Sequence, residues 1–147
     1  MNLYLGSDHG GYKLKGELAD YLKEAGHEVV DLGVFNGDSI DYPDIAREVA
    51  EKVIENPGAF GLLVCGTGIG MQMSANKFKG IRSTVATDEH MAEMSRKHNN
   101  ANILTLGGRT TDLEKAKTIL DKFLSTDFEE GEERHVRRVA KMDELLG

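Results

Sequence analysis

The single cysteine of this 147-residue sequence is followed by a glycine at every second position, in the order Cys65-Gly66-Thr67-Gly68-Ile69-Gly70. A glycine-rich loop lets successive backbone N–H groups point into one concavity that favours negative charge, and a helix starting after it adds a positive end. Both features favour the thiolate of a nearby cysteine and the stabilisation of an oxyanion on a substrate. The loop therefore indicates a reactive thiol beside an anion site. A small buried cysteine next to a tight turn would give the same pattern.

Two familiar loops do not fit this segment. A phosphatase-type loop needs an arginine six residues after the cysteine, where this chain has Met71. The dinucleotide fingerprint G-x-G-x-x-G needs a last glycine where Met71 or Met73 stands. We therefore expect no nucleotide cofactor.

Other polar residues with chemical potential follow apolar segments or lie near the C-terminus. Asp8 and His9 come directly after the first apolar run, and Asp8 is equally suited to capping a turn. His98 ends a predicted helix, where the helix dipole stabilises a cationic imidazole, so a structural role is also open. Arg134 and Arg138 are four residues apart and would share one helix face, a spacing suited to clamping a phosphate.

The same arginine-rich segment has a simpler interpretation as a solvated surface, because Glu130 and Glu133 stand four residues before Arg134 and Arg137. Two further histidines, His27 and His90, have no companions at metal-ligand spacing. We expect no metal site.

Composition limits the class of protein. The length and an apolar content of 39% suit one domain, residues 1–147, with its own core. One cysteine cannot form an internal disulfide, which fits a reducing cytoplasm. No apolar run approaches the ~20 residues of a membrane span. A net charge of −7 disfavours nucleic-acid binding. We expect a cytoplasmic protein that binds neither membranes nor nucleic acid.

Short apolar segments alternate with amphipathic ones along the chain. The alternation predicts an α/β, Rossmann-like, doubly wound fold: a five-stranded parallel sheet with helices on both faces, plus an extra C-terminal helix that could pack on a partner subunit. The expected strands are 3–5, 28–32, 60–64, 82–86 and 103–106, and the expected helices are 12–25, 43–55, 70–77, 89–98, 112–124 and 133–146. Ligands of such folds bind at the carboxyl ends of the strands, where the polar segments after the strands would gather.

Six segments in order resemble the ribose-5-phosphate isomerase B family, from the first strand to the last helix. They are Gly6-Ser-Asp-His-Gly-Gly11, Asp41-Tyr-Pro-Asp44, Cys65-Gly-Thr-Gly-Ile-Gly70, Ser74-Ala-Asn-Lys77, His98-Asn-Asn-Ala-Asn102 and Arg134-His-Val-Arg-Arg138. The resemblance implies interconversion of ribose 5-phosphate and ribulose 5-phosphate through an enediolate, without metal or cofactor. It also implies a homodimer, or a dimer of dimers, whose active sites are shared between subunits.

The resemblance further implies roles for individual residues. Cys65 would be the base, with Thr67 assisting, and His98 would open the sugar ring. The remaining implied contacts to the sugar phosphate are Asp8, His9, Gly66, Gly68, Ile69, Gly70, Asn99, Arg109, Arg134 and Arg138, the arginines chiefly for phosphate.

Related activities share this scaffold. A branch of the family uses a glutamate just after the glycine loop as base, and Met71 at that place assigns this chain to the cysteine branch. Isomerisation of allose 6-phosphate or galactose 6-phosphate and a non-catalytic sugar-phosphate sensor are the alternatives. The chain departs from the family pattern before Arg134, where Glu132 and Glu133 replace two glycines that are common in the family.

Overall fold

The computed structural model describes residues 1–145 and contains one five-stranded parallel sheet. Its strand order is β2-β1-β3-β5-β4, so β2 and β4 are the edges. The strands are β1 (Asn2–Ser7), β2 (Glu28–Asp31), β3 (Phe60–Cys65), β4 (Ser83–Val85) and β5 (Ile103–Gly107). The predicted five-stranded parallel sheet is confirmed, and the predicted strand boundaries differ by one or two residues.

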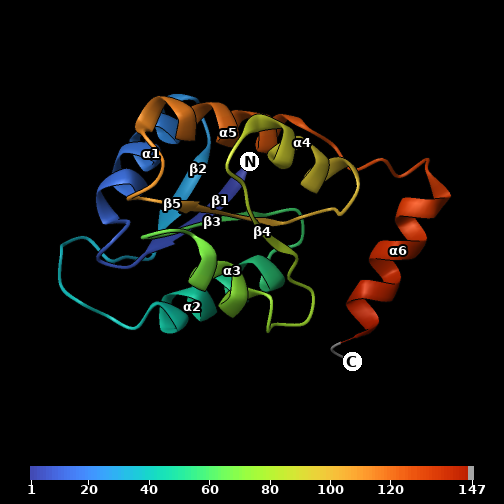
Figure 1. Ribbon diagram of the computed structural model, residues 1–147, viewed down its shortest axis with the longest axis horizontal. Helices are drawn as coiled ribbons and strands as arrows, with labels where there is room; N and C mark the ends of the chain where they lie inside the picture. Colours follow the sequence, from blue (N-terminus) through green and yellow to red (C-terminus); the bar gives the residue numbers. More distant parts are fainter. Residues whose placement is uncertain (146–147) are drawn as a thin grey trace.

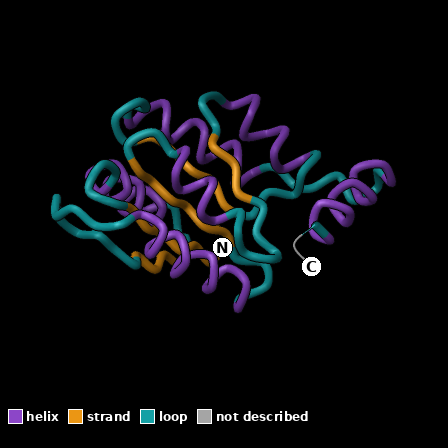
Figure 2. Tube along the Cα trace, turned by 60° about the horizontal axis from the view of Figure 1, so that its bottom comes forward, coloured by secondary structure: helices purple, strands orange, loops and turns teal. Residues whose placement is uncertain are grey.

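Helices cover both faces of the sheet, as predicted for a doubly wound fold (Figure 1). One face carries α1 (Tyr12–Glu24), α4 (Glu89–Lys97) and α5 (Leu113–Ser125). The opposite face carries α2 (Tyr42–Glu55) and α3 (Ile69–Ala75). Figure 2 shows the strands enclosed between these two layers.

Local sequence signals account for the ends of several helices. Asp88 and Asp112 precede α4 and α5, and their carboxylates accept hydrogen bonds from the first-turn amides of Met91 and Lys115, each at 2.8 Å. Gly26, after α1, has φ +91°, a conformation that glycine adopts without steric cost. These caps satisfy backbone groups that a helix leaves unpaired.

Alternate residues of the central strands supply the two halves of the core. Leu62 and Val64 of β3 pack among residues of α1 and α5, whereas Leu63 and Cys65 pack among residues of α2 and α3. Side chains of a strand alternate between the faces of a sheet, so the register of β3 places the Cys65 side chain on the α2/α3 face.

The last helix, α6 (Glu133–Glu144), extends away from the body of the molecule (Figures 1 and 2). Its apolar side chains Val136 and Met142 stay partly exposed, and Leu145 just after it is 84% exposed. The predicted C-terminal helix is confirmed, although the predicted end, Leu146, lies outside the described residues.

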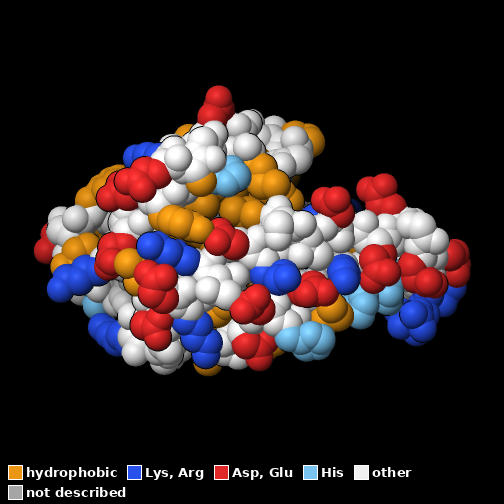
Figure 3. Space-filling model, turned by 90° about the horizontal axis from the view of Figure 1, so that it is seen from above, with side chains coloured by type: hydrophobic (Ala, Val, Ile, Leu, Met, Phe, Trp, Pro, Cys, Tyr) orange, Lys and Arg blue, Asp and Glu red, His pale blue; other side chains and the backbone are white. Residues whose placement is uncertain are grey.

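Charged side chains of both signs are intermingled over the face seen from above, with no broad basic surface there (Figure 3). None of the helices within residues 1–145 is both long and apolar enough to cross a membrane.

Candidate active site

The polar segments singled out in the sequence meet at the carboxyl ends of β1, β3 and β5. These three strands are adjacent, and the chain reverses its direction of travel across the sheet between β1 and β3. Such a reversal creates the crevice in which open α/β sheets bind ligands. Ser7 pairs with Val64 and Cys65 pairs with Gly107, so the loops that follow the three strands begin side by side.

Cys65 is the last residue of β3 and is 5% exposed. Its Sγ accepts a hydrogen bond from the backbone N–H of Gly68 at 3.1 Å. Gly68 has φ +83°, and a Cβ at this position would lie 3.0 Å from the carbonyl carbon of Leu106. Any other residue would be strained by this conformation and crowded by Leu106, and the resulting turn directs an amide at the sulfur. A donated N–H stabilises an anionic sulfur more than a neutral one.

Arg109 covers the backbone of two of the three loops. Its N–H donates to the carbonyl of Gly66 at 3.0 Å, and Gly108 N–H donates to the carbonyl of Cys65 at 2.7 Å. A Cβ at Gly66 would lie 3.2 Å from Arg109 Nη1, and one at Gly10 would lie 3.3 Å from Cζ. The guanidinium therefore lies against the loops after β1 and β3, at the carboxyl ends of the strands, where the thiol also lies.

Asp8 and His9 occupy different positions in the loop after β1. The Asp8 carboxylate is buried and accepts the N–H of Gly10 at 2.8 Å, so it orders the turn, which is the simpler role considered from the sequence. The His9 ring is partly buried, and its Nδ1 is enclosed and has no hydrogen-bond partner within residues 1–145. Buried polar atoms are nearly always paired, so this nitrogen is suited to contact a ligand.

The start of α3 completes this edge. Thr67 is exposed, and its Oγ1 accepts the N–H of Ile69 at 3.3 Å. A Cβ at Gly70 would lie 2.8 Å from Cζ of Tyr42, so the phenol ring packs directly on the glycine. Tyr42 is 39% exposed and was not among the predicted site residues. Its only sequence signal is its place beside Pro43, in one of the six segments that resemble the family.

His98 and Asn99 lie at the amino-terminal ends of the strands, whereas Cys65 lies at the carboxyl ends. They follow α4, which runs antiparallel to the strands, and the chain then reaches Asn102, whose carbonyl accepts the N–H of Gly61 at the start of β3 (2.9 Å). From Phe60 to Cys65 the strand advances about 16 Å, at ~3.3 Å per residue. One copy of the chain therefore does not bring His98 to the thiol.

Arg134 and Arg138 also lie away from the thiol, on the exposed α6. Arg137 Nη1 donates a hydrogen bond to the Glu133 carboxylate at 2.7 Å, one of the two surface pairs that the sequence suggested. Arg134 and Arg138 form no ion pair with other residues in the described part of the chain, so their guanidinium groups remain available for an anion.

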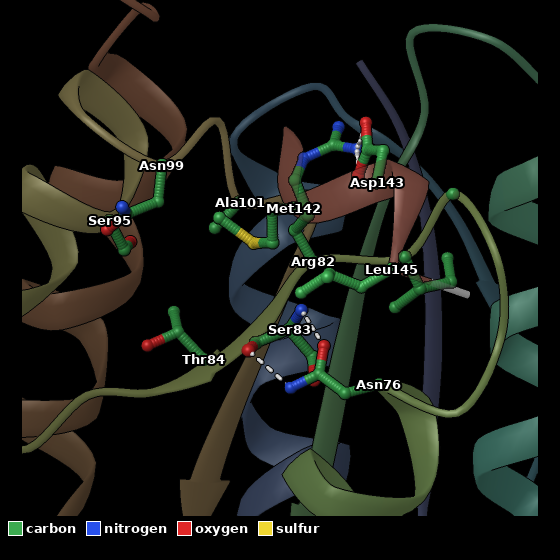
Figure 4. Close-up of a pocket in the computed structure, with 12 residues that line it drawn as sticks. Asn76, Arg82, Ser83, Thr84, Ser95, Asn99, Ala101, Met142, Asp143 and Leu145 are labelled. Carbon is green, nitrogen blue, oxygen red and sulfur yellow. Dashed lines mark hydrogen bonds and ion pairs between the residues drawn. The ribbon is translucent and has the colours of Figure 1, made fainter. Parts of the chain in front are cut away.

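A cavity of about 380 Å³ lies between the loop before β4, the end of α4 and the end of α6 (Figure 4). Asn99 lines it, as do Arg82 and Asp143, whose ion pair measures 3.1 Å. This cavity lies at the amino-terminal ends of the strands, away from Cys65, and none of the loop residues around the thiol line it. The thiol, the Gly68 amide and Arg109 all lie at the carboxyl ends of the strands. We therefore take that end, and not the cavity, as the candidate active site.

Comparisons with known proteins agree over almost the whole chain. A model of the family described as Ribose/Galactose Isomerase matches residues 3–142. Ribose-5-phosphate isomerase B of Escherichia coli is 43% identical over 134 residues, covering 91% of this chain and 89% of the relative. A ribose 5-phosphate isomerase structure from Thermotoga maritima has a TM-score of 0.93 at 45% identity and covers 97% of both chains. A ribose-5-phosphate isomerase B structure from Clostridium thermocellum has a TM-score of 0.93 at 48% identity, covering 99% of this chain and 97% of that one.

Proposed function

The chain belongs to the Ribose/Galactose Isomerase family, and on that premise we propose that it interconverts ribose 5-phosphate and ribulose 5-phosphate with Cys65 as the base. The similarity to proteins named ribose-5-phosphate isomerase B supports the substrate. The observation that supports the base is the Gly68 amide 3.1 Å from Cys65 Sγ, at the edge of the sheet where ligands of this fold bind.

The proposed reaction moves one proton between two neighbouring carbons of the open-chain sugar. The Cys65 thiolate takes the proton from C2 of the aldose, and the electron pair left behind forms the C1–C2 double bond of an enediolate. The thiol then returns the proton to C1 to give the ketose, while the hydroxyl proton moves between O2 and O1. No atom is gained or lost. The amides of residues 66–70 stabilise the enediolate oxygen, and the Thr67 hydroxyl assists that transfer.

Binding of the phosphate and opening of the ring require further groups. Arg109 is the cation that lies against the loops beside the thiol of its own chain. We assign ring opening to His98, sugar contacts to Asn99, and phosphate binding to Arg134 and Arg138. Since these groups lie about 16 Å from the thiol or on the projecting α6, a complete site needs a second copy of the chain. A homodimer with shared sites follows, and a dimer of such dimers is compatible with it.

The test is a coupled assay of both directions of the pentose phosphate reaction with Cys65→Ser and Cys65→Ala. Serine keeps an acceptor for the Gly68 amide but is a far weaker base, so we expect kcat to fall about 10²- to 10⁴-fold in either variant. Circular dichroism and thermal unfolding check that the fold is retained. A folded Cys65→Ser protein with unchanged kcat would show that another group is the base.

A hexose 6-phosphate is the second candidate substrate, because the matching family also includes galactose isomerases. The ratio kcat/KM for ribose 5-phosphate, allose 6-phosphate and galactose 6-phosphate separates these substrates. We expect the largest value for ribose 5-phosphate. Tight binding of a sugar phosphate without isomerisation of any of the three would instead support a sensor.

A further inference from the structure

Three potential metal ligands meet near the end of α4, at a distance from the thiol loop. They are His98 after α4, Glu129 in the connection between α5 and α6, and His135 in the first turn of α6. His98 Nε2 lies 3.4 Å from Glu129 Oε1, and His135 Nε2 lies 4.0 Å from the same oxygen. The two imidazole rings are stacked, with centroids 4.3 Å apart and planes inclined by 19°. One ligand atom of each residue lies within 4.8 Å of the others.

Backbone contacts hold this cluster in place. Glu129 N–H donates to the carbonyl of Lys97 at 3.1 Å, which joins the connection to the end of α4. His135 N–H donates to the carbonyl of Glu132 at 3.0 Å, and the His135 side chain is buried. Lys97, the neighbouring cation, is hydrogen-bonded to Glu93 at 2.8 Å. The Glu129 carboxylate therefore has the two histidines, rather than a lysine, as its close partners.

The distances suit a small transition-metal ion. Zinc bonds to nitrogen and oxygen measure about 2.0–2.1 Å, so two ligand atoms of a tetrahedral site lie roughly 3.3–3.4 Å apart. The separation of 3.4 Å matches this value, and that of 4.0 Å must shorten by roughly 0.6 Å when an ion binds. The stacked rings must tilt apart for both nitrogen lone pairs to meet one ion, and His98 has room to do so because its side chain is 41% exposed.

We propose that His98, Glu129 and His135 bind one Zn²⁺ ion, and that the bound ion inhibits the isomerase by occupying His98 Nε2. Two imidazoles and one carboxylate form a donor set that zinc accepts with a fourth position open, and imidazole ligands disfavour magnesium and calcium. The inhibitory part rests on the proposed function, in which His98 transfers protons during ring opening. The proposal departs from the sequence-based expectation of no metal, because the three ligands are distant in the sequence and meet only in the fold.

Direct binding tests the site without reference to activity. The full chain, freed of metal by a chelator, is titrated with Zn²⁺ by calorimetry and with Co²⁺ by visible absorption. We expect one ion per chain and, in Glu129→Gln, an affinity at least about tenfold lower. The matched control is Glu130→Gln, which makes the same change in the same connection and should bind like the wild type. No binding by the wild type, or equal affinity in Glu129→Gln, would overturn the site.

Inhibition is measured separately in the two directions. The metal-free rate of Glu129→Gln is measured first and serves as the reference for that variant, because its carboxylate contacts His98 Nε2. Saturating Zn²⁺ should slow the reaction from ribose 5-phosphate about 10²-fold. The reaction from ribulose 5-phosphate should be slowed less, because this ketose carries its phosphate on the C5 oxygen and does not form a furanose ring. Glu129→Gln should need at least about ten times more Zn²⁺ for the same effect. Equal sensitivity of the two proteins would instead locate the inhibitory ion elsewhere, for example on the Cys65 thiol. If the chain isomerises no sugar phosphate, the binding titration still decides whether the metal site exists.

Discussion

Two inactive variants should restore isomerisation when mixed, if each active site takes Cys65 from one chain and His98 from the other. The structure places these residues at opposite ends of β3, about 16 Å apart along the strand. Cys65→Ala and His98→Asn should each lose about 10²-fold or more in kcat as pure proteins. In a dimer that carries one variant chain of each kind, one of the two sites has both residues intact and the other has neither.

The expected recovery follows from counting chains. When equal amounts of the two variants are unfolded together and refolded, half of the dimers should be mixed, and one site in two should work in those. Activity should therefore return to roughly a quarter of the wild-type value per chain. The coupled isomerase assay measures this recovery, and analytical ultracentrifugation checks that the refolded protein is dimeric.

A matched mixture distinguishes sharing from general stabilisation. Arg109 lies at the same edge of the same chain as Cys65, against Gly10 and Gly66. In a mixture of Cys65→Ala with Arg109→Ala, every site of the mixed dimer should lack one of the two groups. Measured well below KM, the activity should therefore not rise above that of the Arg109→Ala chains alone. The reasoning is refuted if the Cys65→Ala and His98→Asn mixture stays inactive although mixed dimers are present, or if a monomeric fraction has wild-type activity.

Three further predictions concern single residues. Gly68→Ala should destabilise the fold by more than about 1 kcal/mol, measured by chemical unfolding, and should lower kcat, because φ is +83° and the space is closed. Arg109→Ala should raise KM for ribose 5-phosphate at least about tenfold, whereas Arg47→Ala on the exposed side of α2 should leave KM unchanged; equal values would exclude a phosphate contact. The hydrogen bond to Asp121 raises the pKa of Tyr21. We expect this hydrogen bond to stabilise the folded protein by about 0.5–1 kcal/mol. The stabilisation is complete below the unfolded tyrosine pKa of about 10 and is lost as pH rises through the higher folded pKa. Tyr21→Phe should therefore be less stable than the wild type at neutral pH and equally stable at strongly alkaline pH.

Much of the fold was predictable because its signals are local. The apolar run 60–64 predicted β3, and its alternating side chains decide which face of the sheet each residue meets. The helix after Asp112 was predicted from its amphipathic pattern, and the carboxylate of that residue caps it. The remaining errors are at element ends, as at 82–86, where the strand is Ser83–Val85.

The candidate site was predictable only in part. The glycine spacing after Cys65 indicated a loop of inward-pointing amides, and Gly68 N–H does contact the sulfur. The packing of Tyr42 on Gly70 was not predicted, since it depends on where α2 begins relative to α3. The sequence left open whether Asp8 caps a turn; the structure shows that its carboxylate accepts the Gly10 N–H, and its contact with a ligand stays a prediction.

By itself, the amino-acid sequence predicted the helices and strands and the class of fold, because side-chain periodicity and the conformations open to glycine are properties of neighbouring residues. The order of the six segments indicated the family and with it the candidate site residues. The tertiary structure alone decided which of these residues meet. It placed Arg109 against the thiol loop, left His98 at the far edge of the sheet, and gathered Glu129 and His135 around His98. Those positions depend on strand order and on the direction of each connecting helix, which are fixed by packing between segments that are distant in the sequence.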